Sequence, residues 1–479
     1  MKLLVVAPYP PSDDSNGLRA RAWAEAVVRS RPEASVVVAA SEASYDVGFE
    51  TSSDAPPSPA LTVRRVWSRN DPVRRTVANV LAESDRFRPE VAHLHFNYLT
   101  FGHPIKSFAV LARLLEGFAR RGVRTVVTLH SVVASPVRYL ASRFGAEVSF
   151  PPIVDRLSAP LSAALLARAL RTADEVAVVS PEALAWLRRH TTLRSLGHIP
   201  LGACTDAPPP APPEAEEARE RVASVPQVIC VGRLVPYKGL EDLIRAIGLL
   251  VDRGRDLQLT IVGGIESSQL SARWYLERLR GIARKAGRGA VQLENRYVRA
   301  PEYAYLQRLA DVIVLPFRDD GIIGTSGSVL DFGVSFSARL VLTDVPRLRG
   351  YEQMEGVRYC PTGDPASLAE AIWPAVQAPR VDPAARWREL ALLTPSAIAA
   401  RYLAVYDRLL SVTGGTPAET VPVPSPVTTS VVRYLRAATM AEPGVAPGVE
   451  RETTEEGVPP LSARPAGFLS VGGVEQRPR

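Results

Sequence analysis

Short apolar runs alternate with amphipathic stretches along the first 410 residues of this chain. The runs contain many β-branched residues and few charges, a pattern typical of strands that are buried on both faces of a sheet. In the first half of the chain, apolar residues spaced three and four apart predict helices over 18–30, 75–86, 107–121 and 160–172. The strands predicted between them are Leu3–Ala7, Ser35–Ala40, Leu61–Trp67, Val91–Phe96, Thr125–Leu129 and Val176–Val179.

The second half of the chain repeats this alternation. Strands that alternate with helices form parallel sheets whose two faces are covered by the helices. The pattern therefore predicts an α/β protein with two doubly wound, Rossmann-like domains that face one another. Helices are predicted over 240–254, 266–286, 302–309, 328–336 and 366–377, and the predicted strands are Val228–Gly232, Leu257–Val262, Val291–Leu293, Asp311–Leu315, Leu340–Thr343 and Val357–Cys360.

Composition sets the expected domain boundaries. We expect an N-terminal domain over 1–205, a linker rich in Pro, Ala and Glu over 206–224, and a C-terminal domain over 225–395. A helix over 396–412 closes the folded part of the chain. The remaining tail, 413–479, is rich in Pro, Val, Thr, Glu and Gly and is expected to be disordered.

The balance of charge narrows the classes of ligand. The formal net charge is +7 and the pI is near 9.4, which favours anionic ligands such as phosphates, nucleic acids or membrane surfaces. The sequence contains neither a dense Lys/Arg stripe nor a nucleic-acid-reading motif, so we expect no nucleic-acid partner. No GxGxxG opens a first helix, which argues against a dinucleotide dehydrogenase.

Cysteine usage and the N-terminus indicate the compartment. The three cysteines form no CxxC pair, so they predict neither a disulfide framework nor a zinc site and fit a reduced cytoplasm. The apolar run in MKLLVVAPYPP is too short for a secretory signal, and no run reaches the ~20 residues that span a bilayer. We expect a cytoplasmic protein whose basicity permits peripheral contact with the inner face of a membrane. The predominance of arginine over lysine suggests a bacterial source, and no segment predicts an oligomeric state.

The most specific segment is VICVGRLVPYKGLEDLIRAI, residues 228–247. A predicted strand ends at Gly232, and the loop that follows carries Arg233 and Lys238. Ligands of parallel sheets bind at the carboxyl ends of strands. Two cations on such a loop can clamp two phosphates, the arginine through its planar fork and the lysine as a point charge. The alternative is a solvated pair of loop charges, but lysine is so scarce in this chain that the functional interpretation is favoured.

A second candidate segment is FRDDGIIGTSGSVLDFG, residues 317–333. Ser326, Gly327 and Ser328 are small and precede a predicted helix. Exposed backbone N–H groups and the helix dipole make such a segment an anion cradle. The alternative is an ordinary serine N-cap.

The order and spacing of these segments resemble one known family. The GRLVPYKG segment at 232–239, LTIVGG at 259–264, RLADVIVLPF at 308–317, LVLTDVP at 340–346 and GDPASLAEAI at 363–372 are similar to the retaining family 4 glycosyltransferases of GT-B fold (glycosyl transferases group 1). The likeness covers most of 1–412. It implies transfer of a sugar from a UDP- or GDP-linked donor to an acceptor hydroxyl, with retention of anomeric configuration.

The resemblance also implies roles for individual residues. Arg233 and Lys238 would bind the donor diphosphate, together with Ser326, Gly327 and Ser328, and would stabilise it as it leaves. Because these cations supply the charge, no metal and no cofactor are expected beside the nucleotide-sugar co-substrate. The N-terminal domain would bind the acceptor and the C-terminal domain the donor.

One departure from the family pattern concerns its two glutamates separated by seven residues. Asp331 falls at the second of them, which implies binding of the ribose hydroxyls. The first falls on Ile323, unless Asp319 or Asp320 replaces it through a shifted loop. This departure, with the long tail, keeps open the alternative of a catalytically impaired scaffold that binds a nucleotide sugar. The double-Rossmann form keeps open a second alternative, a sugar-nucleotide epimerase or hydrolase.

Three histidines of the first domain are candidates for the site. His130 ends the strand in TVVTLHSVV, and by resemblance it contacts the donor sugar near the reaction centre, the alternative being a structural histidine. His93 and His95 alternate on one face of VAHLHFNY. They lack a third ligand at a suitable spacing, so no zinc site is expected, and one of them could line the acceptor cleft.

The loop after the first strand is the last candidate. Asn16 and Gly17 would let the backbone approach substrate, and by resemblance a glycine here lies close to donor and acceptor. Arg19 and Arg21 could meet an anionic acceptor, or they could be solvated helix arginines. Ser180, followed by Pro181, is interpreted as the N-cap of the next helix.

Overall fold

All residues described below belong to one compact unit of the chain. The tail at 413–479 and residues 207–224 of the predicted linker lie outside the described part, so the expectations for both stay predictions. The computed structural model describes residues 1–10, 15–42, 58–143, 152–206, 225–265, 270–287, 289–296, 298, 300–325, 327, 329 and 338–411.

The first sheet has the strand order of a Rossmann fold. Its seven strands are β1 (Lys2–Ala7), β2 (Ser35–Ser41), β3 (Leu61–Trp67), β4 (Val91–Phe96), β5 (Arg124–Leu129), β7 (Glu175–Val178) and β8 (Leu196–His198). They lie in the order β3-β2-β1-β4-β5-β7-β8, and all neighbours are parallel. The order reverses between β1 and β4, and ligands of such sheets bind at the carboxyl ends of strands beside that switch point.

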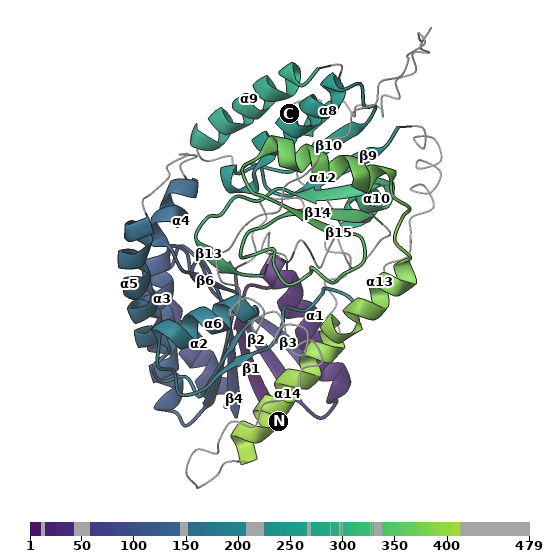
Figure 1. Cartoon of the computed structure of the whole chain (residues 1–479). Helices are drawn as coiled ribbons and strands as arrows, with labels where there is room; N and C mark the ends of the chain where they lie inside the picture. The colour runs from purple at the N-terminus through teal and green to yellow at the C-terminus, as the bar shows by residue number, and fades with distance from the viewer. Residues whose placement is uncertain are drawn as a thin grey trace, which may run out of the picture. The chain divides into compact units, whose positions relative to one another are not determined.

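Helices cover both faces of this sheet, as Figure 1 shows. They are α1 (Ser15–Ser30), α2 (Val73–Phe87), α3 (Pro104–Ala119), α4 (Pro136–Arg143), α5 (Pro152–Leu170), α6 (Pro181–His190) and the late helix α14 (Pro395–Ser411). Side chains alternate across a strand, so Leu4 and Val6 enter one core with α2, α3, α5 and α6. Leu3 and Val5 enter the opposite core with α1 and α14.

The second sheet repeats this topology. Its strands are β9 (Gln227–Val231), β10 (Gln258–Val262), β11 (Val291–Glu294), β12 (Val312–Leu315), β14 (Arg339–Thr343) and β15 (Val357–Cys360), in the all-parallel order β11-β10-β9-β12-β14-β15. The strand order of this sheet reverses between β9 and β12. Its helices are α8 (Leu240–Asp252), α9 (Leu270–Lys285), α10 (Ala300–Leu309), α12 (Pro365–Gln377) and α13 (Pro383–Leu390).

Two short antiparallel strands connect a loop at the carboxyl edge of the first sheet with a loop at the carboxyl edge of the second. β6 (Ser131–Val133) comes directly after β5, and β13 (Ile322–Gly324) follows β12. Ile323 pairs with Val132 in this ladder, and the amides of Ala134 and Ser135 both donate to the carbonyl of Gly321 at 2.9 Å. The carboxyl-end loops of the two sheets are therefore hydrogen-bonded to each other (Figure 1).

Helix α14 returns the chain to the first sheet. Ile398, Tyr402 and Tyr406 recur every fourth residue, and all three are buried in the core that contains β1. Arg31 holds the outer side of the helix through two hydrogen bonds to Asp407, at 2.6 and 2.7 Å. The helix predicted to close the folded part thus completes the core of the N-terminal half.

The predicted secondary structure is close to the observed one, with specific corrections. Helix α5 begins at Pro152 instead of 160, because the helix continues through Pro160, which we had interpreted as its start. The short elements α4, α13, β6, β8 and β13 were not predicted, since few residues carry their pattern. The helix predicted over 328–336 lies largely outside the described residues. The N-cap role of Ser180 is confirmed, because its hydroxyl accepts the amide of Ala183 at 3.1 Å.

Candidate active site

The loops after β9 and β12 form the centre of the candidate site. Both strands lie at the switch point of the second sheet, so their carboxyl ends are its expected ligand-binding edge. The loop after β9 carries Arg233 and Lys238, and the loop after β12 carries residues 316–321. The predicted diphosphate clamp therefore lies where the topology favours a ligand.

Gly239 fixes the position of Lys238 against β12. Pro236–Lys238 form a 3-10 turn, and Gly239 follows with a φ of 66°, in the left-handed region that favours glycine. A Cβ atom at Gly239 would lie 1.8 Å from the carbonyl oxygen of Pro316, so a side chain there would collide with backbone. This close approach places Lys238 Nζ 3.8 Å from the centre of the Phe317 ring, a cation–π contact.

Three cations converge around Tyr237. Burial alone would raise the pKa of the Tyr237 hydroxyl, but Arg233, Lys238 and Arg347 together lower it below its usual value. Arg347 comes from the loop after β14, and its guanidinium lies 5.3 Å from the centre of the Tyr237 ring. Burial, assisted by the two arginines, lowers the pKa of Lys238 to about 8. The positive field that produces these shifts suits a multiply charged anion.

The two aspartates of the loop after β12 are each bound to an arginine. Asp320 is buried and accepts a hydrogen bond from Arg347 at 2.7 Å, and burial raises the pKa of its carboxyl. Asp319 accepts from Arg138 of α4 at 2.6 Å. Asp319 and Asp320 are the two candidates to replace the missing glutamate. Asp320 lies beside the predicted diphosphate clamp, whereas Asp319 lies beside α4 of the N-terminal half. Ile323 packs against the first core and offers no polar side-chain atom.

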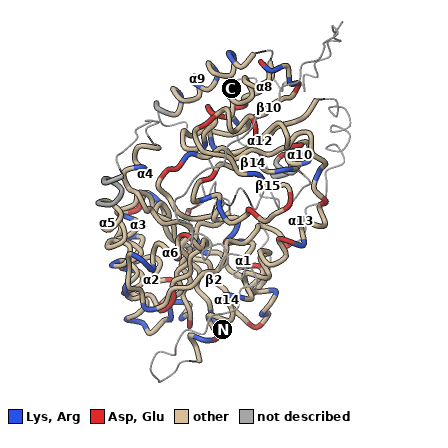
Figure 2. Tube along the Cα trace, viewed as in Figure 1, with Lys and Arg blue, Asp and Glu red and all other residues tan. Residues whose placement is uncertain are grey.

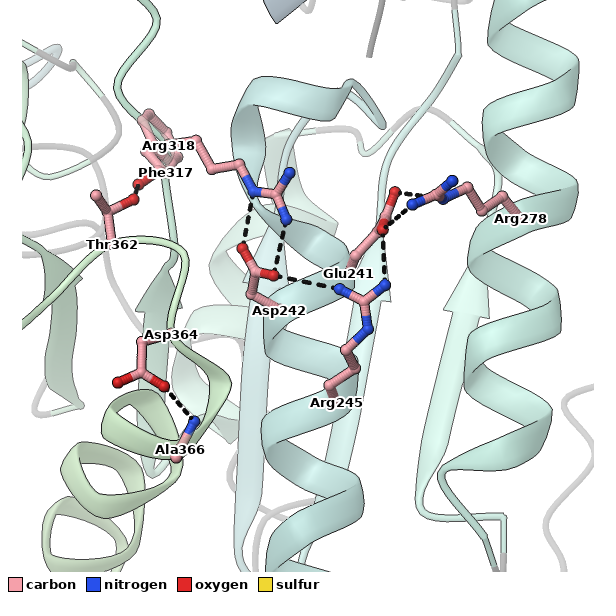
Figure 3. A network of polar contacts seen from close by, with 9 residues as sticks. All are labelled: Glu241, Asp242, Arg245, Arg278, Phe317, Arg318, Thr362, Asp364 and Ala366. Carbon is pink, nitrogen blue, oxygen red and sulfur yellow. Dashed lines mark hydrogen bonds and ion pairs between the residues drawn. The ribbon is translucent and has the colours of Figure 1, made fainter. Parts of the chain in front are cut away.

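A network of ion pairs anchors the helix that follows Lys238 (Figure 3). Glu241 and Asp242 are buried in the first turn of α8, where acidic side chains also interact favourably with the positive end of the helix dipole. Arg318 donates to both carboxylate oxygens of Asp242 at 2.8 Å, and Arg245 reaches both acids. Arg278 of α9 donates to Glu241 at 2.9 Å. The network ties α8 to α9 and to the segment that bears Asp320.

Removal of one acid from this network should destabilise the second domain. In Asp242→Ala, Arg318 loses its carboxylate partner, and we expect a loss of about 2 kcal/mol, below the range for fully buried pairs because Arg318 remains partly solvated. Urea unfolding measures this change. Asp252→Ala is the matched control, since Asp252 is exposed at the other end of α8 and its loss should change stability by less than about 0.5 kcal/mol. Equal effects in the two variants would contradict the anchoring role.

Arg19 connects the first-strand loop to the second candidate segment. It is buried, and its guanidinium donates to the carbonyl of Gly202 at 3.2 Å and to that of Gly327 at 3.0 Å. A Cβ at Gly327 would lie 2.3 Å from the Arg19 guanidinium carbon, so a side chain at this position would displace the arginine. The structure thus brings together Arg19 and Gly327. Ser326, Ser328 and Asp331 lie outside the described residues, while Asn16 is partly buried and Gly17 buried near the start of α1.

The three histidines form a buried row at the carboxyl ends of β4 and β5. His93 is bonded at both ring nitrogens, to the hydroxyls of Tyr406 at 2.5 Å and Thr128 at 2.7 Å. His95 Nδ1 lies 3.2 Å from His130 Nε2, and their outer nitrogens have no partner among the described residues. Burial lowers the pKa of all three imidazoles, that of His130 to about 3 with help from the Arg19 charge.

A comparison with known protein families matches one segment of the chain. Residues 225–377 match the family model described as Glycosyl transferases group 1. We call these matched residues the group 1 domain. The predicted resemblance to glycosyl transferases group 1 is thereby confirmed for the part of the chain that holds Arg233 and Lys238.

Two curated relatives match part of this chain. The GDP-mannose-dependent alpha-(1-6)-phosphatidylinositol monomannoside mannosyltransferase of Mycolicibacterium smegmatis is 33% identical over 195 residues, 38% of this chain and 45% of the relative. The protein of the same name from Mycobacterium tuberculosis is 31% identical over 192 residues, 40% of this chain and 46% of the relative. The matches therefore span less than half the length of these relatives.

Solved structures show the fold of both halves. Sucrose-phosphate synthase from Thermosynechococcus elongatus superposes with a TM-score of 0.64 at 19% identity, over 86% of this chain and all of that structure. Trehalose-6-phosphate synthase from E. coli, bound with UDP-2-fluoro glucose, has a TM-score of 0.61 at 15% identity, over 85% of this chain and 99% of that structure. The predicted GT-B fold, with two Rossmann-like bodies, is confirmed.

Two residues near the predicted diphosphate clamp, Tyr98 and Arg347, were not predicted from the sequence. Tyr98 comes from the loop after β4, and burial raises the pKa of its hydroxyl while the charge of Arg347 opposes that rise. Arg347 follows the strand LVLT, and its position after a strand end was the signal that could have identified it. Nothing in the sequence pairs Tyr98 with Arg347, because these residues come from different sheets.

Charged residues of both signs are distributed along the described chain. Figure 2 shows Lys and Arg interspersed with Asp and Glu along the chain. Among the described residues, no helix combines the length and the apolar composition that a membrane crossing requires.

Proposed function

We propose that the protein is a glycosyltransferase that moves a sugar from a nucleotide-diphosphate sugar to an acceptor hydroxyl, with retention of anomeric configuration. The observation that carries this proposal is the convergence of Arg233, Lys238 and Arg347 around Tyr237 at the switch point of the group 1 domain. Three cations at the carboxyl edge of a parallel sheet suit a diphosphate.

The proposed mechanism is electrostatic. As the bond between the anomeric carbon and the diphosphate oxygen breaks, negative charge grows on the leaving group. Lys238 opposes that charge as a point cation and Arg233 through its fork of N–H donors. A phosphate oxygen of the leaving group accepts the proton of the acceptor hydroxyl as the new glycosidic bond forms. The side chains provide the positive charge, so the proposal requires no metal ion.

Other roles follow from the family resemblance and stay proposals. His130 lies beside the sugar near the reaction centre, and Asp331 binds the ribose hydroxyls. The amides around Gly327 hold the diphosphate, with Arg19 beside them. Residues assigned to the phosphate cradle and to the loop between donor and acceptor are Ser326, Gly327, Ser328, Asn16, Gly17 and Arg19.

GDP-mannose is the first donor to consider, because both curated relatives are named as GDP-mannose-dependent mannosyltransferases. Their names also suggest a lipid-linked mannoside as acceptor, which fits a cytoplasmic enzyme in peripheral contact with the inner face of a bacterial membrane. Asp320 would then contact the transferred sugar in place of the missing glutamate, since it lies beside Arg347 at the clamp.

Arg347 should contribute to donor affinity. Its loss removes one charge-assisted contact to the diphosphate, so Arg347→Ala should weaken nucleotide-sugar binding about tenfold or more. Arg349→Ala is the matched control, because Arg349 lies two residues further along the same loop and pairs with Asp344 at 2.6 Å. Calorimetric titration with GDP-mannose and UDP-glucose measures both. Equal dissociation constants for the two variants would contradict a role of Arg347 in donor binding.

A turnover assay tests the proposed function. The protein is incubated with GDP-mannose, UDP-glucose or UDP-N-acetylglucosamine, with and without phosphatidylinositol mannosides or sugar phosphates as acceptors. We expect release of nucleoside diphosphate and a glycosylated product only when an acceptor is present, and NMR of the product reports its anomeric configuration. Conversion of the nucleotide sugar without an acceptor would establish an epimerase or hydrolase instead.

A nucleotide-sugar-binding scaffold is the second candidate. It is favoured by one observation: Ile323 stands where the family places a carboxylate, and both nearby aspartates are bound to arginines. Such a protein would bind a nucleotide sugar and release no product with any acceptor. An Asp320→Asn variant separates the two candidates, because only a transferase that uses Asp320 would lose turnover while it kept nucleotide affinity.

A further inference from the structure

Two buried imidazole nitrogens at the carboxyl end of the first sheet lack a partner. His95 and His130 are 6% and 8% exposed, and neither His95 Nε2 nor His130 Nδ1 has a hydrogen-bond partner among the described residues. A buried polar atom that stays unpaired costs about 1–3 kcal/mol, so such atoms in native sites call for an explanation. Both residues line one cavity, together with Arg19, Trp23, Thr128 and Tyr402.

The two inner nitrogens share one proton. His95 Nδ1 and His130 Nε2 are 3.2 Å apart, a hydrogen-bond distance, so one of them donates and the other accepts. Both rings are neutral, since burial lowers the pKa of His95 and His130 far below the usual range. A neutral imidazole carries one N–H and one lone pair. The state of each inner nitrogen therefore fixes the state of the outer nitrogen on the same ring.

Only two arrangements satisfy this bond. If His95 Nδ1 donates, His95 Nε2 is a lone pair and His130 Nδ1 carries a proton. If His130 Nε2 donates, His95 Nε2 carries the proton and His130 Nδ1 is the lone pair. In either arrangement both rings hold the same tautomer, and the two outer nitrogens are one donor and one acceptor.

We propose that His95 is the positioning residue of His130: through the shared proton it fixes whether His130 Nδ1 donates to or accepts from a sugar hydroxyl of the substrate. A hydroxyl group can donate or accept, so it can satisfy His130 Nδ1 in either arrangement, whereas His95 Nε2 lies at the opposite end of the pair. The assignment rests on the proposed function, since it takes the nucleotide sugar or its acceptor as the source of the hydroxyl. His93, by contrast, has both nitrogens occupied by hydroxyls of the protein and has no such role.

Imidazole ¹⁵N NMR of the full chain tests the shared tautomer without any activity assay. The chain has six histidines, so single substitutions can assign their signals. We expect His95 and His130 to show the same tautomer, either both Nδ1–H or both Nε2–H. Opposite tautomers would place two protons or two lone pairs between the rings, and this result would overturn the proposal.

Two substitutions separate the inner from the outer nitrogen of His95. The amide of asparagine replaces Nδ1, so His95→Asn keeps a partner for His130 and should leave the His130 tautomer as in wild type. The amide of glutamine replaces Nε2, so His95→Gln should give a mixture of His130 tautomers and lower kcat about tenfold, the loss of roughly one hydrogen bond, with KM nearly unchanged. His103→Gln is the control, since His103 lies at the exposed start of α3. Identical His130 tautomers in the Gln and Asn variants would refute the positioning role.

The hydroxyl is tested with GDP-mannose and UDP-glucose as probes. Whichever of them binds should shift the outer-nitrogen signal of His130 and leave the signals of His93 unchanged. Binding, followed by calorimetry, with no such shift would overturn the hydroxyl assignment and leave the proposed function standing. If neither nucleotide sugar binds, the proposed function fails and the hydroxyl assignment fails with it. The tautomer result still decides whether His95 positions His130.

Discussion

Replacement of Lys238 by alanine should lower the rate of sugar transfer by about 10²–10³-fold while the fold stays intact. The ammonium group lies at the carboxyl edge of the second sheet, against Phe317 and beside Arg233 and Arg347, and this surrounding cationic field is suited to the leaving diphosphate. Removal of one preorganised group that stabilises developing charge costs enzymes about this much. Lys238 makes no carboxylate pair among the described residues, so its loss should change stability little.

The pKa of Lys238 adds a pH signature to this prediction. Burial holds it at about 8 in the free protein, so the ammonium form that binds the diphosphate predominates below pH 8 and is lost as the pH rises above it. Nucleotide affinity should therefore fall by up to about tenfold per pH unit above 8. Lys238→Arg is the control, because a guanidinium stays charged and should remove this dependence. Turnover near the wild-type level in Lys238→Ala, or a flat pH profile in the wild type, would contradict the assigned role.

Gly239→Ala should strongly destabilise the group 1 domain. The φ of 66° strains any L-residue by about 1 kcal/mol, and the new Cβ would lie 1.8 Å from the carbonyl oxygen of Pro316. The clash forces β12 and α8 apart, so we expect a total loss of roughly 3 kcal/mol or more. Thermal unfolding should show a melting temperature about 6–12 °C lower, in the range for domains of this size.

Gly254→Ala isolates the backbone contribution to that loss. Gly254 has a similar φ of 75°, and a Cβ there would meet no described residue within 4 Å. This variant should lose about 1 kcal/mol from backbone strain alone. Equal losses in the two glycine variants would mean that the contact with Pro316 has no energetic weight and that Lys238 is not held by this approach.

The strands and the position of Arg233 and Lys238 were predictable because their signals are local. Strands buried on both faces are continuous apolar runs, so β1, β4, β9 and β12 stand out in the sequence within a residue or two of their observed ends. Arg233 and Lys238 lie on one loop next to such a run. Their position at the carboxyl end of a strand followed from the alternation of strands and helices alone.

The rest of the candidate site depends on segments that are far apart in the chain. The ladder between β6 and β13 joins residues near 132 and 323, and each strand is only three residues long, too short for a periodic pattern. Arg19 reaches Gly327, and Arg347 reaches Asp320, through contacts that no local spacing encodes. The bond between His95 and His130 requires β4 and β5 to be neighbours, which is a property of the sheet rather than of either strand.

Calorimetric titration of wild type and Lys238→Ala with GDP, UDP and the corresponding monophosphates tests the central claim most directly. The account predicts that the wild type binds one nucleoside diphosphate more tightly than its monophosphate, and that Lys238→Ala loses at least about tenfold in affinity for the diphosphate with little change for the monophosphate. Equal diphosphate affinity in the two proteins, or no binding of any nucleotide to the wild type, would contradict a donor diphosphate held at Lys238.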